Sequence, residues 1–482
     1  MYRLIKTSLK LLDNSDELKL SYLMGNKLKS NPKLVNRNTS YKGVFFRTAI
    51  FIRKLLLSFC LKPQSYKKKS DRVYIYSGTK NQYDSLFSTA KNLHYEGVTF
   101  KWIQDNYSQE NKLFPSKTNH LELSIKVFIS AIILFILKAP ILYIKLIKLG
   151  KLDEIKYGFD DFCLNYIYIP YFVDEMSRCS YSLVMMSNDH NPANRCLNLI
   201  AREYRIKTSY LQHASISSMF PRLEFDYAFL DGYQAFEQYL NCEENIGLIS
   251  GKAPVVMNRK VFLSGQKKIL ENKKLNADVD FNFGVAVNKL DIVEHVIECI
   301  TKLIDSGYKV ALRMHPAQNK EFITAINSFL LQENNPDIII MNARDVSLLE
   351  YFSFVDVLFA SNSSIHLEAA LAGLVTVYAD FGDVSIKKDY YGYVSKGLSL
   401  EFNAEYCDEF FENLFEFSVS SHREKAIREY SATYSTVWEG QEGKLVAETV
   451  KDILSDSFDI TYNYFERIPE ISNSQFEIYQ IS

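Results

Sequence analysis

The sequence lacks the cysteine pattern of a disulfide framework or a structural zinc site. Its 482 residues include seven cysteines, an odd number, which are scattered and never spaced as CxxC. Disulfide-stapled and zinc-stapled folds use cysteines in recurring, closely spaced pairs. We therefore expect a protein of the reducing cytosol. Apolar residues make up 47% of the chain, which is enough to bury two cores and excludes global disorder.

A secretory leader is also missing, and no apolar segment is an obvious membrane span. Residues 1–20 have neither a continuous apolar core nor a small-residue cleavage site, so we expect the protein to stay inside the cell. Ser124–Lys151 holds five lysines and no acid, and its uncharged run, Val127–Leu137, is 11 residues long. A span needs roughly 20 apolar residues. Including Lys138 and Pro140 would make the segment a marginal span.

We interpret Ser124–Lys151 and the similar segment Gly43–Lys62 as helices that lie on the membrane face. Lysine side chains at such positions extend toward anionic headgroups while their apolar stems stay buried. The alternative is a core helix with solvated lysine tips. Whether the longer segment spans the bilayer or lies on it is left open by the sequence.

Charge is nearly balanced overall, at −1, but it is unevenly placed. Residues 1–70 carry 16 Lys or Arg against 3 Asp or Glu, whereas residues 451–482 carry 6 acidic against 2 basic residues. A basic arm on a neutral body indicates an anionic partner, either acidic lipid or nucleic acid. The chain contains no nucleic-acid recognition motif, so we expect the membrane surface and no nucleic acid.

Short apolar runs alternate with helical patterns along most of the chain. Strands are expected at 72–78, 98–104, 182–190, 208–215, 225–232, 260–266, 281–288, 308–314, 337–343, 356–361 and 374–381. Strands that alternate with helices of this length form βαβ units in parallel sheets. We predict an α/β protein with two facing doubly wound, Rossmann-like domains. The expected divisions are a basic helical extension at 1–70, an N-terminal domain at 71–252 with an apolar cationic insertion at 123–151, a C-terminal domain at 253–450, and an acidic tail at 451–482.

Two strand-to-helix junctions in the C-terminal half carry the strongest functional signal. In YKVALRMHPAQ, proline ends the strand and aims His315 away from the sheet, with Arg313 two residues earlier on the same side. In DVLFASNSSIHLEAALAG, Ser363 or Ser364 suits the N-cap of a helix that ends at Gly373. Polar groups at the carboxyl ends of parallel strands share one crevice, and a helix N-terminus there suits phosphates. The set predicted to hold a nucleotide is Arg313, His315, Pro316, Ser361, Asn362, Ser363, Ser364 and Glu368.

Within this set, His315 is predicted to bind or protonate a departing phosphate, and Glu368 to bind ribose hydroxyls. A satisfied histidine at a sheet edge and a well-capped helix are the plain structural alternatives. In the N-terminal half, three strands end in polar residues that could deprotonate an acceptor hydroxyl. These candidates are Asp189, His190, His213 and Asp231. Helix capping and turn formation are the alternatives for the two aspartates.

The RMHP motif, followed about 45 residues later by SNSSIHLEAALAG, resembles the HP and SS motifs of bacterial sialyltransferases and polysialyltransferases. It is equally similar to motifs of capsule Kdo transferases and CDP-glycerol glycerophosphotransferases. These are GT-B enzymes of surface-polysaccharide synthesis, and the resemblance covers about residues 180–380. It implies that His315, Pro316, Ser363 and Ser364 bind the cytidine phosphate of the donor. LQHAS resembles a QHG element, and LDG matches a [DE][DE]G base motif only at Asp231 and Gly232.

The resemblance implies a cytoplasmic, membrane-peripheral glycosyltransferase. Its donor would be a nucleotide sugar, most plausibly CMP- or CDP-linked, which is a substrate and not a cofactor. Its acceptor would be lipid-linked or a polysaccharide. The chain has no DxD-like pair at a strand end, so we expect catalysis without a metal. Two alternatives are a UDP-sugar 2-epimerase, which shares the two-domain architecture, and a non-catalytic membrane-bound scaffold.

Overall fold

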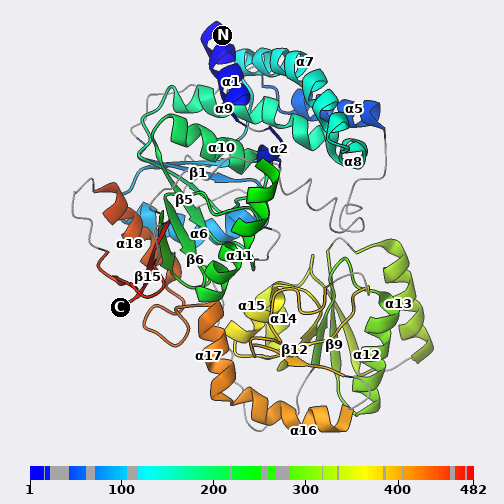
Figure 1. Ribbon diagram of the computed structural model, residues 1–482. Helices are drawn as coiled ribbons and strands as arrows, with labels where there is room; N and C mark the ends of the chain where they lie inside the picture. Colours follow the sequence, from blue (N-terminus) through cyan, green and yellow to red (C-terminus); the bar gives the residue numbers. More distant parts are fainter. Residues whose placement is uncertain are drawn as a thin grey trace. The chain divides into compact units, whose positions relative to one another are not determined.

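The structure of the protein is a computed structural model of the 482-residue chain. It describes residues 1–15, 17–21, 43–60, 71–105, 118–216, 220–250, 259–267, 283–316, 318–333, 336–383, 387–403, 407–455, 462–472 and 475–482. The chain forms two compact units, one of residues 1–268 and 441–482, the other of residues 269–440. Each unit contains one sheet with helices packed on it (Figure 1).

The first unit is built on a nine-stranded sheet of order β14-β15-β7-β6-β5-β4-β1-β2-β3. Its strands are β1 (Val73–Ser77), β2 (Phe100–Gln104), β3 (Thr118–His120), β4 (Leu183–Met186), β5 (Lys207–Leu211), β6 (Tyr227–Leu230), β7 (Arg259–Leu263), β14 (Phe465–Arg467) and β15 (Phe476–Ile481). Neighbouring strands run parallel from β3 to β15, and β14 is antiparallel to β15. β1, β4 and β6 are buried at every residue, as expected for strands covered on both faces.

Helices cover this sheet and extend beyond it at one end of the unit (Figure 1). They are α1 (Tyr2–Asn14), α2 (Glu17–Leu20), α5 (Val44–Leu57), α6 (Lys80–Tyr95), α7 (Ile125–Lys148), α8 (Leu152–Cys163), α9 (Asn165–Met176), α10 (Pro192–Glu203), α11 (Tyr233–Ser250) and α18 (Glu442–Leu454). α6 packs against α18 and β1, whereas α10 packs against α9, β4 and β5. α1, α7 and α8 pack on α9, and α5 packs on α8.

The second unit is built on a six-stranded parallel sheet of order β10-β9-β8-β11-β12-β13. Its elements are β8 (Phe283–Ala286), α12 (Val293–Asp305), β9 (Val310–Met314), α13 (Lys320–Glu333), β10 (Ile338–Asn342), α14 (Leu348–Ser353), β11 (Val357–Ala360), α15 (Ile365–Leu371), β12 (Val375–Tyr378), β13 (Leu400–Glu401), α16 (Cys407–Ser418) and α17 (Ser421–Tyr430). One core lies between the sheet and α12, α13 and α16, and another between the sheet and α14 and α15.

Both sheets are doubly wound. In the second sheet the first strand, β8, has its successors β9 and β10 on one side and β11, β12 and β13 on the other. In the first sheet β1 has β2 and β3 on one side and β4 to β7 on the other. Each order is the Rossmann order 3-2-1-4-5-6, and ligands of such sheets bind at the carboxyl ends of the strands where the order reverses. These switch points lie between β1 and β4 and between β8 and β11.

The predicted domain boundaries need correction at both ends of the second unit. The strand at 260–266, assigned to the C-terminal domain, is β7, and it pairs with β6 in the first sheet. The acidic tail at 451–482 is no tail, because β15 extends the same sheet next to β7. The two units divide after residues 268 and 440, whereas the sequence predicted boundaries after 252 and 450. The boundary at 252 falls outside the described residues, as do parts of the basic extension.

Candidate functional site

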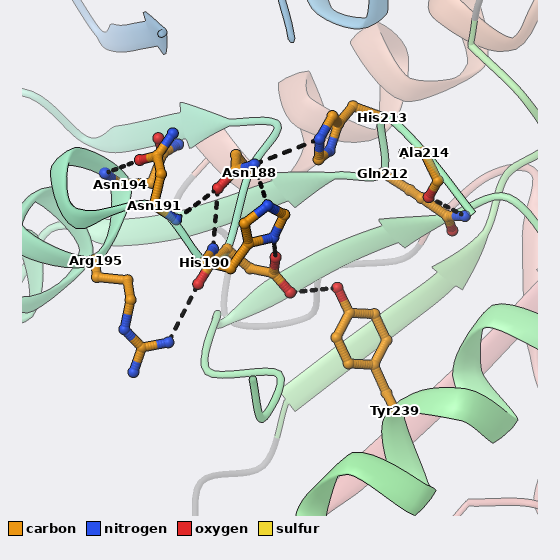
Figure 2. Close-up of polar contacts among 10 residues, drawn as sticks. Asn188, His190, Asn191, Asn194, Arg195, Gln212, His213, Ala214 and Tyr239 are labelled. Atoms are coloured by element: carbon orange, nitrogen blue, oxygen red, sulfur yellow. Dashed lines mark hydrogen bonds and ion pairs between the residues drawn. The ribbon is translucent and has the colours of Figure 1, made fainter. Parts of the chain in front are cut away.

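At the carboxyl edge of the first sheet, Asn188 holds two histidines together (Figure 2). Asn188 lies two residues after the end of β4, next to the switch point. Its Oδ1 accepts backbone N–H bonds from His190 (2.9 Å) and Asn191 (2.8 Å), which fixes the orientation of the amide. The Nδ2 group therefore faces the two imidazoles and lies 3.1 Å from His190 Nε2 and 3.4 Å from His213 Nε2. Since an amide nitrogen only donates, both Nε2 atoms act as acceptors.

The other nitrogen of His190 is bound to a buried carboxylate. His190 Nδ1 lies 2.8 Å from Asp189 Oδ1, and Tyr239 donates to Asp189 Oδ2 at 2.5 Å. Burial raises the pKa of Tyr239 well above its ordinary value, with the Asp189 charge adding to the effect, so the hydroxyl stays protonated. The carboxylate thus holds the proton of His190 on Nδ1 and leaves Nε2 basic. An imidazole oriented in this way is a competent general base.

His213 and Asp231, at the ends of β5 and β6, differ in their surroundings. His213 shares the Asn188 amide and lies 5.9 Å from His190 between ring centroids. Asp231 is buried and accepts from Lys267 Nζ at 2.8 Å, and Lys267 also donates to the Phe229 carbonyl. Burial lowers the pKa of Lys267, and the Asp231 charge partly opposes this. Of the four predicted bases, His190 therefore has the geometry of a base, with Asp189 and His213 around it, whereas Asp231 belongs to an ion pair.

At the switch point of the second sheet, Ser361 belongs to a buried polar group. Ser361 Oγ donates to Asp291 Oδ1 at 2.5 Å and accepts from Asn288 Nδ2 at 2.9 Å. Asp291 Oδ2 accepts from the Asn288 backbone N–H at 2.7 Å. Burial raises the pKa of Asp291 to about 7, although these hydrogen bonds oppose the shift. The ends of β8 and β11 are thereby joined before any ligand binds.

The three residues after Ser361, Asn362 to Ser364, form a short loop that leads into α15, which we call the serine loop. Asn362 Oδ1 accepts from the Tyr390 backbone at 2.7 Å, and its Nδ2 donates to the Lys387 carbonyl. Ser364 is the N-cap of α15, but its side chain does not cap the helix; Ser363 Oγ accepts from the Ile365 backbone at 3.4 Å. Both serines are half-buried. The predicted helix end is confirmed, since Gly373 has φ 85° and donates to the Ala370 carbonyl.

His315 and Pro316 follow β9, which is separated from β11 by β8 alone. With strands about 4.8 Å apart, the ends of β9 and β11 lie about 10 Å from each other along one edge. The Pro316 carbonyl accepts from Arg344 Nε at 2.9 Å. Arg344 is exposed and follows β10, so it adds a cation beside the HP loop. His315 itself is half-buried.

Arg313 and Glu368 lie deeper than the loops. The Arg313 guanidinium donates to the carbonyl of Val346 at 3.0 Å and lies 5.2 Å from the centre of the Tyr351 ring. Burial lowers the pKa of Arg313, and the charges of Tyr351 and Glu368 partly offset this. Arg313 therefore holds the loop before α14. Glu368 is a buried residue of α15.

His366, which the sequence did not single out, supports the loop from below. Its Nε2 lies 3.0 Å from the Ser361 carbonyl and its Nδ1 lies 3.0 Å from Ser399 Oγ. The carbonyl can only accept, so the proton is on Nε2. Burial lowers the pKa of His366 to about 4, and the imidazole is neutral at physiological pH. A neutral, fully buried imidazole fixes the backbone of Ser361 without adding charge to the edge.

Besides His366, several residues of these two edges were missed by reading the sequence, among them Arg344, Asn188, Tyr239 and Asp291. Arg344 could have been found, because it follows the predicted strand 337–343 as His315 follows its own. Asn188 lies inside the SNDHNPANR segment but was not distinguished from its neighbours. Tyr239 and Asp291 gave no local signal, because their roles depend on contacts made only in the folded chain.

No model of a known protein family matches the chain, and no curated protein matches it. Solved structures with a similar fold include a UDP-GlcNAc 2-epimerase from Neisseria meningitidis bound to UDP-GlcNAc, with 12% identity and a TM-score of 0.47, covering 79% of this chain and 99% of that one. The calicheamicin glycosyltransferase CalG4 has 10% identity and a TM-score of 0.45, covering 81% and 100%. MurG from Acinetobacter baumannii has 10% identity and a TM-score of 0.42, covering 78% and 98%.

The strand orders and the two compact units of the chain itself make it an α/β protein with two doubly wound Rossmann-like units, as in the GT-B fold, and the predicted fold class is confirmed in these terms. The similar structures differ in activity and are distant in sequence. The function therefore has to be inferred from the chain's own residues.

Proposed function

We propose that this protein is a glycosyltransferase of surface-polysaccharide synthesis. It would transfer a sugar from a nucleotide-activated donor, CMP- or CDP-linked, to a lipid-linked or polysaccharide acceptor. The observation that carries the proposal is the carboxyl edge of the second sheet. There the HP loop, the serine loop and the Arg344 guanidinium lie along one edge, and the serine loop adjoins the Rossmann switch point between β8 and β11.

The second unit is assigned to the donor. As the bond between the anomeric carbon and the phosphate oxygen breaks, its electron pair stays on the phosphate. His315, the Ser363 and Ser364 hydroxyls and the loop amides would stabilise this negative charge. Electrostatic stabilisation of a leaving group is commonly the largest catalytic contribution, and one lost donor costs about 3 kcal/mol. α15 has only seven residues, so the hydroxyls and loop amides matter more here than a helix dipole.

The first unit is assigned to the acceptor. The acceptor hydroxyl would attack the anomeric carbon and give its proton to His190 Nε2, while the Asp189 carboxylate stabilises the imidazolium. The Asn188 amide must leave Nε2 at that moment, and it retains His213 as its second partner at 3.4 Å. His213 thus lets Asn188 release His190 without losing its orientation.

A thermal-shift panel of CMP, CDP, UDP and GDP on the purified chain tests the donor assignment. The proposal expects a selective rise in melting temperature with the cytidine nucleotides and a loss of that rise in His315→Ala. A selective shift with UDP, together with release of free UDP and a 2-epimer from UDP-N-acetylglucosamine, would instead identify an epimerase. No shift with any nucleotide, in a chain that still binds membranes, would identify a scaffold.

A further inference from the structure

α7 is the one helix among the described residues that is long and apolar enough to cross a membrane by length and composition. One side of it is packed against the rest of the first unit. Seven of its residues are buried on this side: Val127, Ser130, Ala131, Leu134, Ala139, Leu142 and Leu146. These positions run from the first turn to the last, so the contact with α1, α8 and α9 extends along the whole helix.

Ion pairs tie the same helix to its neighbours. Lys126, in the first turn, pairs with Asp174 of α9, and Lys138, near the middle, pairs with Asp13 of α1. A spanning orientation would bring Lys138 and Asp13 to the centre of the bilayer, where charged side chains are strongly disfavoured. It would also separate α7 from the helices on which it packs, α1, α8 and α9. The packing therefore favours a helix that stays on the protein.

The opposite side of α7 is apolar and open to solvent. Ile136, Ile141 and Ile144 are 62%, 59% and 52% exposed, and Leu137, Ile147 and Leu149 are exposed beside them. α5 also exposes apolar side chains, with Phe45, Ile52 and Leu56 at helical spacing. α5 is held on α7 by stacking of Phe51 on Phe135, with ring centroids 4.7 Å apart. We call the exposed residues of α5 and α7 the apolar face.

From these observations we propose that the apolar face lies on the surface of an anionic lipid bilayer, with α7 in the plane of the membrane. The charge of the apolar face favours an anionic lipid surface as its partner. α5 and α7 contain no Asp or Glu, and Arg53, Lys145 and Lys148 are exposed among the apolar side chains. Aliphatic side chains immersed below a rim of cations are typical of interfacial helices on acidic lipid. A second copy of this face would instead place like charges against each other.

The apolar face is linked to the polar edge of the first sheet through α5. Lys54 donates to Tyr168 OH at 3.3 Å, Tyr168 donates to Asp105 Oδ2 at 2.7 Å, and Tyr76 donates to the same oxygen. Asp105 follows β2 and Tyr76 belongs to β1, next to the switch point. The lipid surface would thus adjoin the edge that carries His190, which suits a lipid-linked acceptor. This last step rests on the proposed function, whereas membrane docking does not.

Vesicle sedimentation with the full chain tests the docking. The chain is expected to bind vesicles of equal phosphatidylglycerol and phosphatidylcholine, and to bind phosphatidylcholine alone much more weakly. Ile141→Glu with Ile144→Glu should weaken binding by at least about tenfold per side chain, since each loses the transfer of a large aliphatic group. The matched control is Ile323→Glu with Leu331→Glu on α13, which are also exposed and should bind as wild type does.

Two further measurements, on lysine variants and on carbonate extraction, could refute the proposal. Lys145→Gln and Lys148→Gln should each weaken binding to the mixed vesicles by about fivefold at low salt, and salt should reduce the difference. Alkaline carbonate should release the chain from membranes, whereas retention would show that α7 spans them. Equal binding to both vesicle types, unchanged binding by the Ile141/Ile144 variant, or self-association through this face without vesicle binding would each overturn the proposal.

The outcomes are separable from those of the proposed function. Vesicle binding is measured without nucleotide, and the Ile141/Ile144 variant should keep the CMP-induced thermal shift. If CMP does not raise the melting temperature of the wild type, the donor assignment is wrong, whereas the proposal of membrane docking is unaffected.

Discussion

The carboxyl edges of the two sheets are organised differently. At the first edge, side chains from the ends of β4 and β5 bond to each other, and Asn188, Asp189, His190 and Tyr239 form one connected network. At the second edge, the connected groups are Asn288, Asp291 and Ser361, of which Asp291 and Ser361 are buried and Asn288 is half-buried. His315, Ser363 and Ser364 are half-buried above them.

This difference matches the chemistry proposed for each edge. A general base needs one nitrogen held in one tautomer, and a rigid network provides this before the substrate arrives. A phosphate site needs several hydrogen-bond donors that can turn toward the ligand. The residues that hold the backbone of these donors in place therefore lie beneath them and not among them. The buried Asp291–Ser361 pair and the neutral His366 supply that support.

Replacing His190 with Ala tests the base and should have the largest effect. Transfer is expected to fall by about 10² to 10⁴-fold, because an oriented general base contributes that much. CMP binding should stay unchanged, since the proposed donor site belongs to the other unit. The measurements are a turnover assay and a CMP titration, with His94→Ala on α6 as the control. A loss of CMP binding in His190→Ala would contradict the assignment of the base and the nucleotide site to different sheet edges.

Replacing Lys267 with Met tests whether Asp231 is structural. It leaves a buried carboxylate without its partner and should lower the free energy of unfolding by about 3–5 kcal/mol. Urea unfolding of the purified chain measures this. Lys267→Met with Asp231→Asn should regain part of the loss, because the uncompensated charge is gone. A stable Lys267→Met protein with impaired transfer would return Asp231 to the list of candidate bases.

Replacing His315 with Ala tests the phosphate edge. The expected loss of transfer corresponds to about 3 kcal/mol, with weaker CMP binding and an unchanged melting temperature without ligand. His422→Ala, on an exposed position of α17 in the same unit, is the matched control. Turnover like that of the wild type in His315→Ala would contradict the assignment.

A pH series tests the support beneath the serine loop. The folded-state pKa of His366 is about 4 against an ordinary 6.5, so the unfolded chain takes up the proton first as the pH falls. The contribution of this group is complete above pH 6.5 and is lost between about 6.5 and 4, by at most about 3 kcal/mol. Comparing wild type with His366→Gln isolates the effect from Asp291, whose raised pKa acts in the opposite direction. Identical pH dependence in both proteins would mean that His366 is not buried in its neutral form.

The smallest effect concerns nucleotide binding and Asp291. The negative charge of a bound phosphate would disfavour the ionised form of the Asp291 carboxyl further. Because the pKa of Asp291 is already raised to about 7, nucleotide binding near this pH would be accompanied by uptake of a proton. CMP affinity should therefore rise severalfold between pH 8 and 6, beyond any change due to the nucleotide itself. Asp291→Asn removes the titrating group and should flatten this part of the curve, as isothermal titration would show. An equal slope in both proteins would place the phosphate away from Asp291.

Much of the fold followed from short-range patterns. β4, β5, β6, β9 and β11 lie where alternation and polar strand ends predicted them, and each is followed directly by one of the predicted polar residues, namely Ser187, Gln212, Asp231, His315 and Ser361. The same alternation could not show which sheet a strand joins. β7 was therefore placed in the wrong domain, and β15 was hidden by the acidic composition of the C-terminus, although it pairs with β7.

The candidate sites were predicted as residue types at strand ends, but their internal bonding was not. Tyr239 reaches Asp189 from 50 positions away, and Lys267 reaches Asp231 from 36 positions away. Neither pair leaves a local pattern in the sequence, because the bond depends on how the sheet aligns distant segments. For the same reason the sequence treated four possible bases alike, whereas the hydrogen bonds distinguish His190 from Asp231.

A crystal structure of the chain with CMP would test the central claim most directly. The account predicts the phosphate at the β8–β11 switch point, within hydrogen-bonding distance of His315 and of the Ser363 or Ser364 hydroxyl. CMP bound at the first sheet edge, or a phosphate that contacts the serine loop while His315 points elsewhere, would contradict it.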